Sequence, residues 1–182
     1  MPHMAYNFSS AKEEFKKVEE WLRNEYASLH TGRATPMVLD SVMVESYGSF
    51  QPVKNVGSIS VEDPKTLRVV PWDKSQIKEI EKAVQAANLG LSVATDDQGL
   101  RVIFPMLTTE NRQKLVKVLK DKMEDARISV RKVREATQDA IKAAALPEDD
   151  AFRAKEDLQK LVDEANSALE AVFSKKETEV MN

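Results

Sequence analysis

The sequence contains no cysteine, which excludes disulfides, thiolate metal sites and a cysteine nucleophile and suits a reducing compartment. Only five glycines and seven prolines occur among 182 residues, which favours long helices over a many-stranded barrel. No apolar run approaches the roughly 20 residues that span a bilayer. The start, Met1–Met4, lacks the layout of a signal peptide and looks like a cloning remnant. We therefore expect a soluble protein without a membrane segment.

Enzyme motifs are also missing. The chain has two histidines, His3 and His30, and none of the HExxH, GxSxG, Walker or GxGxxG patterns. The carboxylate clusters 96–97 and 148–150 fall in expected loops or helix starts, where nothing supplies further metal ligands. We expect no catalytic residue, no metal site and no cofactor. An enzyme in the middle segment would need convergent polar groups that the sequence does not offer.

Three segments have helical periodicity, at 9–30, 108–145 and 148–179. Ser9 or Ser10 is the expected cap of the first helix, with Glu13 or Glu14 in its first turn. The apolar face of the first helix comprises Phe15, Val18, Leu22, Tyr26 and Leu29, and that of the third comprises Leu158, Leu161, Val162, Ala165, Leu169 and Val172. Short connections predict that these helices pack as antiparallel neighbours in a bundle.

The middle segment changes period. Alternation in 38–47 before a turn at 47–49, and β-branched runs at 53–61 and 66–70, indicate strands. The isolated glycines Gly48, Gly57 and Gly90 are interpreted as turn residues. A helix is predicted at 75–88, and a hairpin at 89–93 and 100–104.

The predicted fold class is therefore α+β: a long antiparallel three-helix bundle with an inserted small β/α/β domain. The bundle comprises residues 1–31 and 106–182, and the insert comprises 32–105. Two stretches of chain connect them. Paired crossings of this kind are natural hinges, here at Thr31, Gly32, Pro105 and Met106.

Basic residues concentrate between positions 112 and 134, which hold nine Lys or Arg against three acids and so carry +6, leaving −9 elsewhere. At 100° per residue, five of them fall within about 100° of arc. These five, called the basic stripe, are Arg112, Lys120, Arg127, Arg131 and Arg134. A solvated helix face is the ordinary alternative. Arginine grips phosphate, however, and acids are scarce on the stripe, so a folded RNA surface is favoured. An acidic membrane would also require exposed apolar residues, which the stripe lacks.

Seven motifs follow one another along the chain: LHTGRATP (29–36), VESYG (44–48), ISVED (59–63), NLGL (88–91), LTTENR (107–112), ARISVRKVR (126–134) and DLQKL (157–161). Together they strongly resemble the ribosome recycling factor family, over about residues 8 to 181. The resemblance implies an L-shaped, non-enzymatic, monomeric protein. Such a protein binds the post-termination 70S ribosome through large-subunit RNA. With elongation factor G and its GTP hydrolysis, it then separates the subunits and releases mRNA and tRNA.

The resemblance also implies particular RNA-binding residues. It assigns this role to Arg33, Arg112, Arg131 and Arg134, and the geometry of the basic stripe adds Arg127. It places the protein in the bacterial cytoplasm, with an organellar form left open. The main alternative is a structural or chaperone-like helical adaptor whose basic stripe is simply solvated.

Three features depart from the family pattern. His30 and Glu135 stand where the family usually has arginine, and the loop before Pro147 is shorter than in many members. Loss of one positive charge and reversal of another predict ribosome binding that is weaker or more sensitive to salt.

Overall fold

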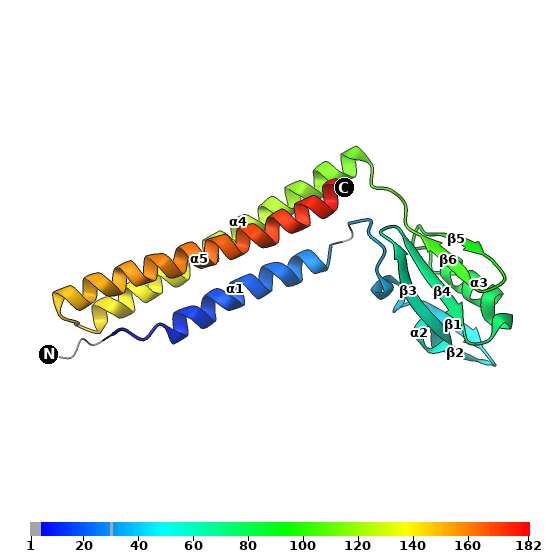
Figure 1. The fold of residues 1–182 in the computed structure, drawn as a ribbon, viewed down its shortest axis with the longest axis horizontal. Coiled ribbons are helices and arrows are strands. Elements are labelled where there is room, and N and C mark those ends of the chain that lie inside the picture. Colours follow the sequence, from blue (N-terminus) through cyan, green and yellow to red (C-terminus); the bar gives the residue numbers. More distant parts are fainter. Residues whose placement is uncertain (1–4, 30) are drawn as a thin grey trace. The chain divides into compact units, whose positions relative to one another are not determined.

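The computed structural model describes residues 5–29 and 31–182, so Met1–Met4 and His30 lie outside the described residues. Contacts divide the described chain into two compact units. Residues 5–29 and 109–182 form a helical unit, and 31–108 form an α/β unit (Figure 1).

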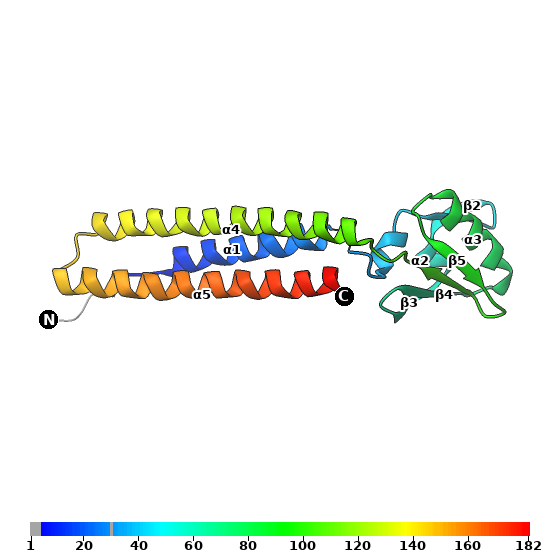
Figure 2. The ribbon, with the colours of Figure 1, turned by 90° about the horizontal axis from the view of Figure 1, so that it is seen from above.

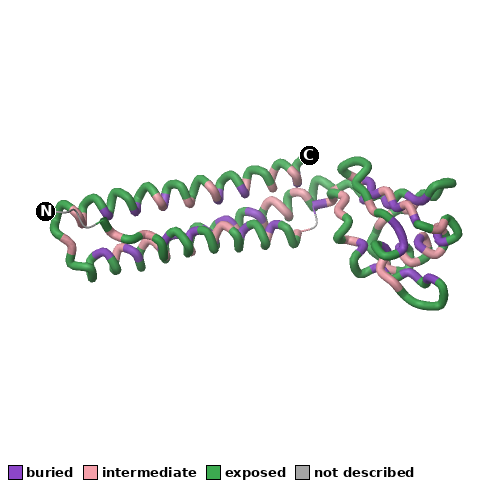
Figure 3. Tube along the Cα trace, turned by 60° about the horizontal axis from the view of Figure 1, so that its bottom comes forward, coloured by how far each residue is buried: buried purple, intermediate pink, exposed green. Residues whose placement is uncertain are grey.

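Three long helices make up the helical unit. They are α1 (Ser9–Ala27), α4 (Thr109–Ala143) and α5 (Glu148–Met181). The chain runs in opposite directions along α4 and α5, which lie side by side, and α1 packs against both (Figures 1 and 2). Buried positions recur at intervals along each helix (Figure 3). The predicted antiparallel packing of three helices is confirmed.

The apolar face of α1 is buried as predicted, with Leu22 fully buried and Val18 partly buried against the same core. The expected start of this helix is wrong in detail. Asn7 Oδ1 accepts hydrogen bonds from the backbone N–H (2.9 Å) and the hydroxyl (2.6 Å) of Ser9, which is already helical. The helix thus begins one residue earlier than expected, because Ser9 is its first residue and not its cap. Glu13 consequently lies beyond the first turn, where the helix dipole is weak.

The connection between α4 and α5 follows the sequence signals. Pro147 immediately precedes α5, and three acidic residues, Glu148, Asp149 and Asp150, occupy its first turn, where the positive end of the helix dipole favours them. The predicted core residues Leu158, Val162, Leu169 and Val172 are buried. The two helices are 35 and 34 residues long, so each offers a face that spans most of the unit.

The α/β unit begins with a 3-10 turn (Pro36–Leu39) and a two-stranded hairpin of β1 (Met43–Ser46) and β2 (Ser49–Pro52). Tyr47 and Gly48 form its two-residue loop, and both have positive φ angles, 50° and 82°. This is the backbone that type I′ hairpin turns require, and glycine adopts it at little cost. The predicted turn at 47–49 is confirmed.

A four-stranded antiparallel sheet has the order β3-β4-β6-β5, formed by β3 (Gly57–Asp63), β4 (Thr66–Pro71), β6 (Leu100–Ile103) and β5 (Ser92–Thr95). The helix α3 (Ile77–Ala86), preceded by a 3-10 turn (Lys74–Gln76), packs against β1 and β5. The predicted hairpin and helix of this unit are therefore confirmed.

One strand prediction is wrong, because the β-branched run at 53–61 begins with a short helix, α2 (Val53–Val56). Val53 and Val56 are both buried, and their i,i+3 spacing on a helical turn directs both side chains to the core. Gly57 is not a turn residue either. Its backbone is extended at the start of β3, and a Cβ there would lie 2.5 Å from the Val70 carbonyl oxygen. Glycine is required by this close approach of β4.

The two connecting stretches contact each other at their ends in the α/β unit. Gly32 has a φ of 74°, and a Cβ there would lie 3.0 Å from Leu107 Cγ. Lys65 Nζ donates a hydrogen bond to the Gly32 carbonyl oxygen (2.9 Å). Thr31 is buried, whereas Pro105 and Met106 are exposed. A hinge at these positions stays a prediction.

Candidate functional site

The basic stripe lies on α4, whose orientation is set by its buried face. Leu119, Ala126 and Val130 are buried in the core of the helical unit. Lys120, Arg127 and Arg131 are exposed, and Arg112 and Arg134 are half-buried. The side chains of the stripe thus lie at the border of the buried face, where they can meet both solvent and the neighbouring helix.

Contacts with α1 fix this orientation. The Tyr26 hydroxyl donates a hydrogen bond to the Leu119 carbonyl oxygen (2.7 Å), and Lys122 Nζ lies 2.6 Å from Glu25 Oε2. Burial raises the pKa of Tyr26 to about 12. The phenol therefore remains a donor at neutral pH and holds α1 against α4.

Arg112 differs from the other members of the stripe. Its Nη1 donates a hydrogen bond to the Met181 carbonyl oxygen (2.8 Å) at the end of α5. Its Nε is buried without a hydrogen-bond partner among the described residues. The last carbonyls of a helix lack partners within the helix and carry partial negative charge, which a guanidinium satisfies. Arg112 therefore stabilises the end of α5 here, and an RNA contact by Arg112 stays a prediction.

The expectation that acids are scarce on the stripe needs correction. Arg127 Nη2 lies 3.0 Å from Glu170 Oε2, and this acid comes from α5. Arg131 Nη1 lies 3.4 Å from Glu124 Oε1, two turns earlier on α4. All four side chains are exposed, so each pair stabilises the fold by no more than about 1 kcal/mol. Such pairs can exchange their carboxylate for another anion.

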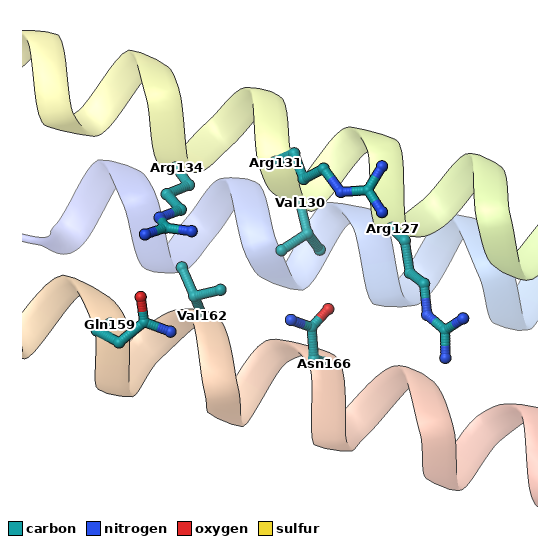
Figure 4. A pocket seen from close by; sticks show the side chains of 7 residues that line it. All are labelled: Arg127, Val130, Arg131, Arg134, Gln159, Val162 and Asn166. Atoms are coloured by element: carbon teal, nitrogen blue, oxygen red, sulfur yellow. The ribbon is translucent and has the colours of Figure 1, made fainter.

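A groove of about 400 Å³ lies between α4 and α5 (Figure 4). Three arginines of the stripe, Arg127, Arg131 and Arg134, line its α4 side. Val130 and Val162 form its apolar part. The groove is therefore cationic at its walls and apolar at its base.

Two side-chain amides, Gln159 and Asn166, complete the groove from α5 and point toward α4 in Figure 4. Among the described residues, no acidic side chain lines the groove. The Arg134 side chain makes no ion pair or hydrogen bond with another described residue, although it is half-buried. An unpaired guanidinium in a partly enclosed site favours an anionic ligand.

These two amides are not predicted from the sequence, because the projection of α4 alone cannot show which side chains of α5 lie beside it. A signal existed: at 100° per residue, Gln159, Asn166 and Glu170 fall on one line of α5, beside the core residue Val162. A polar row next to a buried position marks the edge of a helix interface.

The remaining predicted residues lie elsewhere. Arg33 is exposed and belongs to the α/β unit, so it does not line the groove. Glu135 is exposed on α4, directly after Arg134. His30, the other departure from the family pattern, lies outside the described residues.

The chemistry that these side chains offer is anion binding. No cluster of three or more His, Asp or Glu side chains with the arrangement of a metal site occurs in the described part of the chain. Asp96, one of the carboxylates considered at the sequence level, instead binds Arg68 through two hydrogen bonds of 2.6 and 2.8 Å, and this pairing holds the pKa of Asp96 well below its usual range. Within residues 5–29 and 31–182, no helix is both long enough and apolar enough to cross a membrane.

Comparison with known proteins gives a consistent result. A family model described as "Ribosome recycling factor" matches residues 22–181. A ribosome-recycling factor of Desulforamulus reducens is 43% identical over 176 residues, covering 95% of this chain and 96% of that protein. One of Symbiobacterium thermophilum is 42% identical over 175 residues, covering 94% and 95%.

Solved structures agree with these relatives. The solution structure of a ribosome recycling factor has a TM-score of 0.65 and 36% identity, covering 96% of this chain and 95% of that chain. A second similar chain, with a TM-score of 0.59, 33% identity and coverage of 96% and 97%, comes from models of the T. thermophilus ribosome recycling factor and the E. coli elongation factor G bound to the E. coli post-termination complex.

Proposed function

Because the chain belongs to the ribosome recycling factor family, we propose that it binds the post-termination ribosome and acts there with elongation factor G. GTP hydrolysis by the elongation factor drives separation of the subunits, and mRNA and tRNA are released for reuse. The chain itself performs no covalent chemistry. Its contribution is to bind and to transmit force.

The observation that carries this proposal is the cationic face of α4. Arg127, Arg131 and Arg134 lie within two turns of one rigid helix and border the groove. Phosphate contacts by basic side chains supply a large share of the affinity for nucleic acid and need no particular base sequence. Large-subunit RNA is the partner that this face fits. Arg33 and Arg112 are further proposed contacts.

The two units support a mechanical role. We propose that residues 1–31 with 106–182, and residues 32–105, behave as two domains connected at Thr31, Gly32, Pro105 and Met106. Only two stretches of chain join them, so one domain can remain on RNA while the other is displaced. The bacterial source of the relatives supports action in the bacterial cytoplasm. We propose that the chain acts there as a monomer.

Co-sedimentation with large ribosomal subunits tests the binding step. The wild-type chain should pellet with the subunits, and Arg131→Ala combined with Arg134→Ala should abolish most of the pelleting. Lys12→Ala combined with Lys16→Ala removes the same charge from exposed positions of α1 and serves as the matched control. No pelleting of the wild type would favour the helical adaptor instead.

A further inference from the structure

We propose that the groove between α4 and α5 holds one unstacked nucleotide of the large-subunit RNA. Its phosphate lies on the arginines, and its base edge is bound by Gln159 and Asn166. This inference rests on the proposed function, since it names the part of the RNA that the site takes. It gives α5 a direct role in RNA binding, which the basic stripe on α4 does not predict.

The size and lining of the groove favour a nucleotide over a phosphate alone. Its volume of about 400 Å³ lies in the range of small-molecule sites, far above what one phosphate group fills. Val130 and Val162 contribute methyl groups to the base of the groove. Methyl groups form no hydrogen bond or ion pair with a phosphate, whereas the face of a base packs on them. An unstacked base of single-stranded RNA therefore fits the groove, and RNA loops and bulges supply such bases.

The three arginines of the groove differ in the contacts that a phosphate would have to replace. Arg134 has no partner among the described residues, so it is available to a phosphate without breaking any contact. Arg127 and Arg131 are paired with Glu170 and Glu124, and these exposed pairs are weak. An incoming phosphate can displace both carboxylates, because charge-assisted contacts to phosphate replace those that are lost.

The two amides supply hydrogen-bond acceptors as well as donors, which the arginines cannot. Gln159 Nε2 donates a hydrogen bond to Asp163 Oδ1 (2.8 Å), which holds the side chain in place and leaves its oxygen and second N–H available. The Asn166 side chain makes no hydrogen bond with another described residue. A side-chain amide carries a donor and an acceptor side by side, which is the pattern that base edges present. Arginine offers donors only.

Salt dependence separates the two kinds of contact. Each phosphate contact by a cation contributes to the slope of log affinity against log salt, whereas a contact by a neutral amide does not. The experiment measures binding to large ribosomal subunits at several salt concentrations. It compares the wild type, Arg134→Ala, and the double variant Gln159→Ala with Asn166→Ala. Both amides are exposed, and alanine favours helices, so the double variant should fold.

The double amide variant should lose roughly tenfold in affinity at every salt concentration while keeping the wild-type slope. Arg134→Ala should lose affinity and reduce the slope by about one. Asn24→Ala combined with Gln85→Ala, two exposed amides outside the groove, should bind like the wild type. Reagents that modify the Watson–Crick edges of unpaired bases should reveal one nucleotide that the wild type and the control protect and the double amide variant does not.

The outcomes separate the two proposals. If the double amide variant binds and protects like the wild type while Arg134→Ala weakens binding, the nucleotide site is refuted and recycling through phosphate contacts stands. If the double amide variant changes the salt slope, its effect is electrostatic or structural, and the base contact is refuted. If the wild type does not bind large subunits at all, both proposals fail.

Discussion

Arg112 and Arg134 look equivalent in the sequence, yet the structure predicts that only the removal of Arg112 destabilises the fold. Arg112 donates to the last carbonyl of α5, that of Met181, whereas Arg134 has no partner among the described residues. A hydrogen bond from a charged donor contributes about 1.5–3 kcal/mol when buried. Arg112 is half-buried, so Arg112→Ala should lower the free energy of unfolding by about 1 kcal/mol. Arg134→Ala should change it by less than ~0.5 kcal/mol.

Urea unfolding followed by circular dichroism at 222 nm measures both effects, and thermal unfolding should show a fall of roughly 2–4 °C for Arg112→Ala. Lys120→Ala, an exposed member of the same stripe, is the control and should resemble Arg134→Ala. Equal destabilisation by Arg112→Ala and Arg134→Ala would refute the distinction. So would wild-type stability of Arg112→Ala, since the contact with α5 would then contribute nothing.

Three further predictions concern charge. Glu170→Gln frees Arg127, so binding to large subunits at low salt should strengthen by up to about fivefold, and unchanged affinity would contradict the exchange of carboxylate for phosphate. Because the pKa of Tyr26 is about 12 in the folded protein and about 10 when unfolded, the unfolded state loses its proton first. Stability from this residue is thus complete below pH ~10 and is lost between pH ~10 and ~12. Urea unfolding at several pH values should show that the free energy of unfolding falls less between pH ~10 and ~12 for Tyr26→Phe than for the wild type. Equal falls in the two proteins would contradict this contribution of Tyr26. His30→Arg combined with Glu135→Arg adds positive charge to the chain, in the case of Glu135 directly after Arg134, and should tighten binding to large subunits. Affinity equal to that of the wild type at every salt concentration would contradict a role for these two departures in binding.

The long helices could be predicted because each carries an apolar face repeated over many turns, and Pro147 marks the junction between two of them. The helix α2 could not, because a single turn of four residues with two valines has no period to measure, and β-branched residues suggest a strand. The role of Gly57 could not be predicted for a related reason. The approach of the Val70 carbonyl depends on the pairing of β3 with β4, which no local pattern records.

The site was predictable to the extent that it lies on one helix. Helical projection placed Arg127, Arg131 and Arg134 on one side of α4, and the structure brings all three to one groove. The other wall depends on the pairing of α4 with α5. The register between two helices is set by side-chain packing along the whole interface. For the same reason, the sequence could not show that Arg112 reaches the end of α5.

The most direct test of the proposed function is subunit separation on post-termination ribosomes, followed by light scattering after addition of the chain, elongation factor G and GTP. The wild type should separate the subunits only when both elongation factor G and GTP are present. Arg131→Ala with Arg134→Ala should be slow, and the control Lys12→Ala with Lys16→Ala should match the wild type. Two results would contradict recycling through the cationic face of α4: ribosomes that stay intact with the wild type, or ribosomes that the arginine double variant separates as fast as the wild type does.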